Sequence, residues 1–93
     1  MDLELSVSFA DFERTEYHTT CTYKEMEHIL ERYRQEFLGT LQSKIPDSMI
    51  KLEWYRTSFS SDRPDTQFYL AQAVTRITGK VQTVMRLYYK ITQ

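Results

Sequence analysis

Few residues in this chain have side chains suited to catalysis or metal binding, and they lie just before and along one predicted helix. His18 and Cys21 have the side chains of a base and a nucleophile. They lie an odd number of residues apart in a predicted strand, where side chains at odd spacing point to opposite faces, so they cannot hydrogen-bond directly. We therefore expect Cys21 to pack in the core and predict no catalytic residue.

Metal and cofactor motifs are equally sparse. Glu25 and His28 have the i, i+3 spacing found in di-iron carboxylate bundles, but those sites need two such motifs and two further glutamates on four helices. No zinc-type spacing of Cys and His occurs. The only two glycines, Gly39 and Gly79, cannot form a phosphate loop or a dinucleotide fingerprint. The sequence predicts no metal and no cofactor, and nothing in it supports an enzyme.

Size and composition are those of a small globular protein. The 93 residues form a single predicted domain, 1–93, that is 41% apolar and 27% charged. No apolar run approaches the roughly 20 residues that span a bilayer, and we infer no signal peptide and no membrane contact. A lone Cys21 cannot form an internal disulfide, which favours a cytoplasmic location.

Charge is distributed unevenly along the chain. Residues 1–46 carry nine acidic and five basic side chains, whereas residues 47–93 carry four acidic and seven basic ones. A solvated surface on which charges are unevenly placed explains this distribution. An acidic partner or nucleic acid at the C-terminal part, or self-association that pairs the two halves, also explains it.

One amphipathic helix is predicted over Tyr23–Lys44. Thr22 and Glu25 have the spacing of a capping box, and Pro46 cannot continue a helix. Gly39 either frays the last turn or ends the helix early. The predicted buried stripe follows steps of three and four: Met26, Ile29, Leu30, Tyr33, Phe37 and Leu41.

Strands are predicted on both sides of this helix. Residues 3–9 alternate apolar and polar side chains, as a half-buried strand does. Residues 13–21 form either a second strand of a hairpin or, with the first, one long strand with a bulge. Residues 50–59 alternate in the same way, with Lys51, Tyr55, Thr57 and Phe59 on one side.

The segment 67–91 fits helical spacing as well as a hairpin. Its Thr, Val, Ile, Tyr and Phe content favours strands, and Gly79-Lys80 suits a two-residue turn. If Thr78 pairs with Val81, apolar partners fall on one face: Phe68 with Ile91, Leu70 with Tyr89, Gln72 with Leu87, and Val74 with Met85. The prediction is an α+β fold in which one long helix packs on an antiparallel sheet of four to five strands, in the order β(β)αβββ.

A helix followed by an antiparallel meander resembles the cystatin-like arrangement in outline. The inhibitory Gln-x-Val-x-Gly stretch of that family is missing here, so the resemblance implies no function.

The opposite face of the predicted hairpin is too apolar for a sheet surface left in water. The N-terminal strands or a loop, a second copy or another protein, or a single-stranded nucleic acid would each cover it. We expect a small non-catalytic, regulatory interaction protein that binds a protein partner, with a homodimer as the leading form. The alternative is a single-stranded nucleic-acid-binding module. The predicted partner-binding residues are Tyr55, Tyr69, Ile77, Val84, Arg86, Tyr88 and Lys90.

Overall fold

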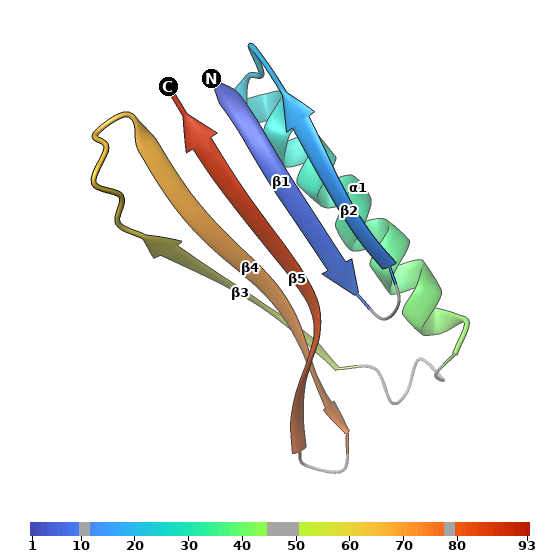
Figure 1. Ribbon diagram of the computed structural model, residues 1–93. Coiled ribbons are helices and arrows are strands. Elements are labelled where there is room, and N and C mark those ends of the chain that lie inside the picture. Colours follow the sequence, from blue (N-terminus) through green and yellow to red (C-terminus); the bar gives the residue numbers. More distant parts are fainter. Residues whose placement is uncertain (10–11, 45–50, 78–79) are drawn as a thin grey trace.

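The architecture is one helix packed on a five-stranded antiparallel sheet, as predicted (Figure 1). The computed structural model describes residues 1–9, 12–44, 51–77 and 80–93, and at 76, 77 and 80–83 it describes the backbone alone. The sheet order is β2-β1-β5-β4-β3, so β5 is central and β2 and β3 are the edges. The elements are β1 (Asp2–Phe9), β2 (Phe12–His18), α1 (Tyr23–Gln42), β3 (Leu52–Phe59), β4 (Thr66–Ile77) and β5 (Lys80–Thr92).

Helix α1 begins where the capping residues predict. The Thr22 hydroxyl accepts a hydrogen bond of 3.1 Å from the backbone N–H of Glu25. The helix ends at Gln42, two residues earlier than predicted, and Gly39 lies inside it. The predicted stripe is confirmed: Met26, Leu30, Tyr33 and Phe37 are buried, and Ile29 and Leu41 are partly buried.

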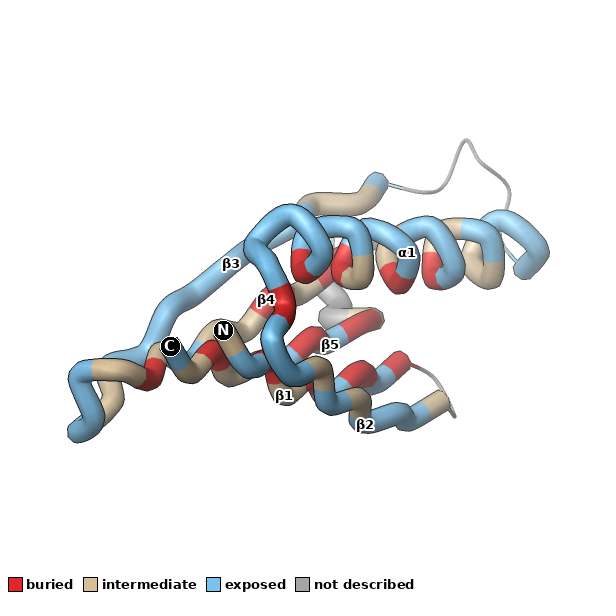
Figure 2. Tube along the Cα trace, turned by 90° about the horizontal axis from the view of Figure 1, so that it is seen from above, coloured by how far each residue is buried: buried red, intermediate tan, exposed pale blue. Residues whose placement is uncertain are grey.

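We call the side of the sheet that α1 covers the inner face and the opposite side the outer face. On β1, Leu3, Leu5, Val7 and Phe9 are buried on the inner face, as their alternation predicts. Figure 2 shows the buried residues gathered where α1 faces β1 and β5. The core therefore lies between the helix and the middle of the sheet.

The first two strands form a hairpin, which settles the choice between a hairpin and one bulged strand. Strand β2 ends at His18 rather than at Cys21. Thr20 has a positive φ of 56° and turns the chain away from the sheet toward the helix. Cys21 is buried beyond this turn, where its backbone N–H donates to the Met1 carbonyl over 2.7 Å.

The predicted β4–β5 hairpin is present, but its predicted register is wrong. Ala73, not Val74, faces Met85, and Tyr69, not Leu70, faces Tyr89. The pairing shifts between Ala73 and Val74, where the extra residue on β5 is Val84. Near the turn Ile77 pairs with Lys80, and the predicted pair Thr78–Val81 involves residue 78, which lies outside the described residues.

A β-bulge of this kind exchanges the faces of one strand relative to its neighbour. The inner face of β5 is the predicted one, with Met85, Leu87, Tyr89 and Ile91 buried. On β4 the faces are reversed, so Ala71 and Ala73 are buried on the inner face and Phe68 is exposed.

Candidate interaction surfaces

The outer face presents apolar side chains on three adjacent strands. Phe59 of β3 pairs with Phe68 of β4, and Leu70 of β4 pairs with Tyr88 of β5. Their exposed fractions are 47% for Phe59, 41% for Phe68 and 50% for Tyr88. Tyr55, on the same side of β3, is 50% exposed. We call Tyr55, Phe59, Phe68, Leu70 and Tyr88 the outer patch.

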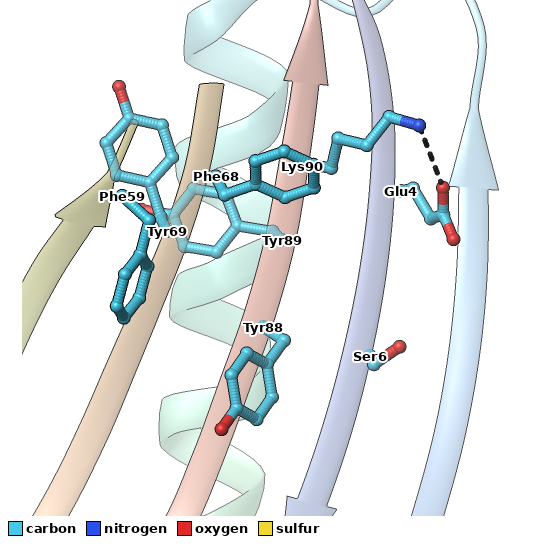
Figure 3. Close-up of a pocket in the computed structure, with 8 residues that line it drawn as sticks. All are labelled: Glu4, Ser6, Phe59, Phe68, Tyr69, Tyr88, Tyr89 and Lys90. Atoms are coloured by element: carbon cyan, nitrogen blue, oxygen red, sulfur yellow. Dashed lines mark ion pairs between the residues drawn. The ribbon is translucent and has the colours of Figure 1, made fainter. Parts of the chain in front are cut away.

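A hollow of about 430 Å³ lies over this patch (Figure 3). Its floor is the sheet itself, and α1 lies on the far side. Lys90 and Glu4 form an ion pair of 3.7 Å at its margin. The lining residues are Glu4, Ser6, Phe59, Phe68, Tyr69, Tyr88, Tyr89 and Lys90.

Charges of both signs surround the outer patch. Lys90 pairs across strands with Phe68 and with Glu4, and Arg86 pairs with Gln72 and Ser8. Carboxylates of Glu4, Glu13 and Glu53 stand on the same face. The surface is therefore an apolar centre with a mixed polar border, which is the usual anatomy of a protein–protein interface.

A second concavity lies on the inner side, between β3 and α1. This groove measures about 380 Å³. We call it the edge groove, and its lining residues are Glu31, Arg34, Gln35, Leu38, Leu52, Trp54, Tyr55, Arg56 and Ala71.

Two arginines of the edge groove are held over aromatic rings. The Arg34 guanidinium lies 5.7 Å from the Trp54 ring centroid, and its Nη1 is 3.0 Å from a Glu31 carboxylate oxygen. The Trp54 ring meets Phe37 edge-on at 6.4 Å. These contacts fix Trp54 and Arg34 relative to the helix although both side chains reach the surface.

Arg56 is held in the same manner by a tyrosine pair. Its guanidinium lies 4.9 Å from the Tyr69 ring centroid and 5.6 Å from that of Tyr89, and those two rings stack at 4.9 Å. Its Nη1 is 3.8 Å from a Glu27 carboxylate oxygen. Burial raises the pKa of the Tyr89 phenol, whose buried hydroxyl has no hydrogen-bond partner in the described structure.

A polar cluster joins the other edge of the sheet to the helix. Glu16 of β2 is 3.3 Å from His18 and 3.4 Å from Arg32. Burial opposes its ionisation, but the nearby Tyr33 hydroxyl, His18 and Arg32 outweigh burial and lower the pKa of Glu16. Burial is the main cause of a raised pKa at Tyr33, and the Glu16 carboxylate is the next. The Tyr33 hydroxyl makes no hydrogen bond of regular geometry among the described residues.

The candidate chemical groups occupy structural positions. Cys21 is buried, and burial followed by the Glu25 carboxylate raises the pKa of its thiol, which keeps it protonated. Because β2 ends at His18, Cys21 does not lie in a strand. The argument from alternating side chains therefore does not apply to His18 and Cys21. Glu25 and His28 are exposed on α1. Among the described residues no three His, Cys, Asp or Glu side chains are grouped to hold a metal ion.

The predicted partner-binding residues divide between the two faces. Arg86, Tyr88 and Lys90 lie on the outer face of β5, and Tyr55 lies on the outer face of β3. The prediction that Tyr69 shares their face is wrong, because Tyr69 stacks on buried Tyr89.

The two remaining predicted residues lie near the bulge and the turn. Val84 is partly buried against the core, because it is the extra residue of the bulge. Ile77 belongs to β4, but its side chain lies outside the described part of the chain.

The sequence interpretation missed two central residues of the outer patch. Phe68 and Leu70 were expected in the core because the predicted register placed them opposite Ile91 and Tyr89. The sequence carries no direct signal for the bulge that reverses them, since β4 is apolar at both odd and even positions.

Comparisons with protein-family models, curated proteins and solved structures return no match to this chain. In the part of the chain that the structure describes, no helix has the length and apolar character needed to cross a membrane.

Proposed function

We propose that this chain is a small non-catalytic interaction protein, regulatory in role, that binds another protein through the outer patch. The observation that carries the proposal is the contiguous, uncovered set of Phe59, Phe68 and Tyr88 on three adjacent strands. Tyr and Phe are enriched at protein interfaces because they bury much area at low entropic cost. An apolar sheet face exposed to water raises the free energy of the folded chain, and a partner that covers this face removes that cost.

The preferred partner is a second copy of the chain. A domain of this size buries only about 60–65% of its unfolded surface, so association adds core that the monomer lacks. Two-fold homodimers are the commonest oligomers, and their interfaces use one self-complementary patch. The buried, protonated Cys21 is compatible with a reducing cytoplasm, the location that we propose.

Light scattering on the purified chain tests self-association. We expect the wild type to be dimeric at high micromolar concentration, and Tyr88→Glu, alone or with Arg86→Glu, to be a folded monomer. A buried carboxylate in an apolar interface is unpaired and strongly destabilises the complex. Tyr17→Glu is the matched control, because Tyr17 is 70% exposed on the outer face of β2, outside the outer patch.

A monomeric wild type at that concentration would contradict the homodimer. Equal loss of association in Tyr17→Glu and Tyr88→Glu would show that the outer patch is not the interface. Circular dichroism of each variant confirms that the fold is retained. A pull-down from the native source with Tyr88→Glu as control then tests for a different protein partner at the same patch.

One observation favours a second candidate, a single-stranded nucleic-acid site. Exposed aromatic rings lie beside Arg86 and Lys90, and bases stack on such rings while cations contact phosphates. The Glu4 carboxylate, already paired with Lys90, opposes phosphate binding. Fluorescence anisotropy with labelled oligonucleotides at low salt decides: binding that weakens steeply with salt supports this candidate, and no binding removes it.

A further inference from the structure

The edge groove has the size and the lining of a small-molecule site. Its volume of about 380 Å³ lies within the range of ligand pockets, roughly 300–1,000 Å³. Leu38 of α1 faces it from one side, and Leu52 and Trp54 of β3 face it from the other. The short side chain of Ala71, on the neighbouring strand β4, leaves space between these two sides. The apolar part of the groove therefore suits an apolar body of small size.

The charged groups that line the groove favour an anion. Arg34 of α1 and Arg56 of β3 both line it, and the carboxylate among its lining residues is that of Glu31. The two oxygens of Glu31 already accept hydrogen bonds from Arg34 at 3.0 Å and from Gln35 at 2.8 Å, which holds this carboxylate against the helix. Each guanidinium carries five N–H donors, so one carboxylate does not satisfy two arginines.

Arg56 is held in place and still has donors to offer. Its guanidinium lies on the inner side of the sheet, 4.9 Å from the Tyr69 ring centroid and 5.6 Å from that of Tyr89. Its Nη1 is 3.8 Å from a Glu27 carboxylate oxygen, which is longer than a hydrogen bond, and both side chains are about half exposed. Stacking on the two rings fixes the guanidinium, so little side-chain freedom is lost when a further acceptor binds.

The Tyr89 hydroxyl is an independent observation that points to an acceptor at this place. Tyr89 is 3% exposed, and its hydroxyl has no hydrogen-bond partner in the described structure, whereas most buried hydroxyls in proteins have one. Burial raises the pKa of this hydroxyl, and the positive charges of Arg56 and Arg34 oppose the rise. A buried donor and two guanidinium groups therefore lie near one another under the helix.

We propose that the edge groove binds a small organic acid. Its carboxylate accepts hydrogen bonds from Arg56 and from the Tyr89 hydroxyl at the inner end of the groove, where Arg34 adds a second positive charge. Its apolar body lies along Leu52 and Trp54. This site lies on the inner side of the sheet, so it is separate from the outer patch and does not depend on the proposed dimer.

The probe is 4-phenylbutanoate, and the neutral 4-phenylbutanamide is its matched control. We expect saturable binding of the acid with a dissociation constant of about 1 mM, the strength expected of a ligand with roughly a dozen non-hydrogen atoms. The emission of Trp54, the only tryptophan in the chain, should change on binding. The amide should bind about ten-fold more weakly or not at all. No saturable binding of the acid, equal binding of acid and amide, or unchanged Trp54 emission at saturation would overturn the proposal.

Tyr89→Phe tests the buried hydroxyl, because it keeps the ring that stacks on Tyr69. We expect about ten-fold weaker binding of the acid, the loss of one hydrogen bond to a charged group, in a variant that is more stable than the wild type when free. Tyr88→Phe is the matched control and should leave the affinity unchanged, since Tyr88 lies on the outer face. An unchanged affinity in Tyr89→Phe would overturn the position assigned to the carboxylate.

Arg56→Gln tests the charge. We expect it to weaken binding of the acid at least about ten-fold and to leave binding of the amide unchanged. Arg63→Gln is the matched control, because it removes the same charge from the exposed segment after β3. Circular dichroism shows whether Arg56→Gln keeps the fold, and Arg34→Gln makes the same comparison if it does not. Equal weakening in the test variant and in Arg63→Gln would overturn the assignment to the edge groove.

Tyr88→Glu separates the edge groove from the outer patch. We expect it to bind 4-phenylbutanoate with the affinity of the wild type and to show the same change in Trp54 emission, whatever its oligomeric state. Weaker binding by Tyr88→Glu would place the acid in the hollow over the outer patch and would overturn the proposal. Light scattering reports on the dimer by itself, so the two proposals can fail independently.

Discussion

Both faces of the sheet carry aromatic side chains, yet only the inner face is packed against the helix. On the inner face Tyr89 is 3% exposed beneath the helix, whereas its chain neighbour Tyr88 on the outer face is 50% exposed. The two rings have similar hydrophobicity and lie on the same strand. The position of α1, and not the apolar content of the strand, therefore decides which residues form the core and which remain available to a partner.

The prediction with the largest expected effect compares two leucines. Leu30 is fully buried on α1, so Leu30→Ala should lower the free energy of unfolding by about 3 kcal/mol. Leu70→Ala removes the same atoms from the outer patch, where Leu70 is only partly buried in the monomer. Measured at a protein concentration low enough to keep the chain monomeric, it should lower the free energy of unfolding by less than about 1 kcal/mol. Urea unfolding followed by circular dichroism measures both, and equal losses would mean that the outer patch is packed in solution.

A second test uses the hydroxyls of neighbouring tyrosines. The Tyr89 hydroxyl is buried without a hydrogen-bond partner in the described structure, so Tyr89→Phe should raise stability by about 1 to 2 kcal/mol. Tyr88→Phe removes an exposed hydroxyl and should leave stability within about 0.5 kcal/mol of the wild type. A loss of stability in Tyr89→Phe would show that the hydroxyl is satisfied.

The same pair gives an alkaline pH dependence. Burial raises the pKa of Tyr89 above the ordinary value of 10.0. The contribution of a group with a raised folded pKa is full below its unfolded pKa and is lost as pH rises through the folded pKa. We expect Tyr89→Phe to lose less stability than the wild type on going from neutral to strongly alkaline pH, and Tyr88→Phe to behave as the wild type.

A smaller effect concerns the start of the helix that covers the inner face. Thr22→Ala removes the hydroxyl that accepts from Glu25 N–H and should lower stability by about 1 kcal/mol. Thr22→Ser keeps the acceptor and should differ little from the wild type. Thermal unfolding of the three proteins distinguishes a capping effect from a general sensitivity at this position.

The smallest expected effect lies where β2 meets the helix. Glu16→Gln should lower stability near neutral pH by about 0.5 kcal/mol, because its ion pairs are partly solvated. Since the folded pKa of Glu16 is lowered from 4.5, its contribution is present above the unfolded pKa and is lost as pH falls through the folded pKa. The difference between variant and wild type should therefore vanish in strong acid, and a difference that persists there would have another cause.

The elements predicted correctly are those with one apolar side. Alternation fixes Leu3, Leu5 and Val7 on the inner face because the intervening residues of β1 are polar. The cap at Thr22 and the stripe on α1 are likewise local in origin. Short-range patterns suffice wherever only one arrangement buries the apolar residues.

The register of β4 shows where that reasoning stops. Phe68 and Leu70 on one side and Tyr69 and Ala71 on the other are both apolar enough to be core. The choice is made by a bulge at Val84, for which no local pattern in the sequence gives a signal. The same limit applies to the candidate site. The sequence places Tyr55, Arg86, Tyr88 and Lys90 correctly on the outer face. The positions of Phe68 and Leu70 and the presence of the edge groove depend on tertiary structure.

The central position of β5 also has a consequence for synthesis on the ribosome. Among the described elements β5 is the last to be translated, yet it separates the β1–β2 hairpin from the β3–β4 pair. Until it emerges, a nascent chain holds two small β units that are not joined to each other. The β1–β5 pairing that joins them links residues far apart in sequence, and contacts of such high order form slowly. The β1 edge is exposed during this interval and is closed only when β5 inserts beside it (Figure 1).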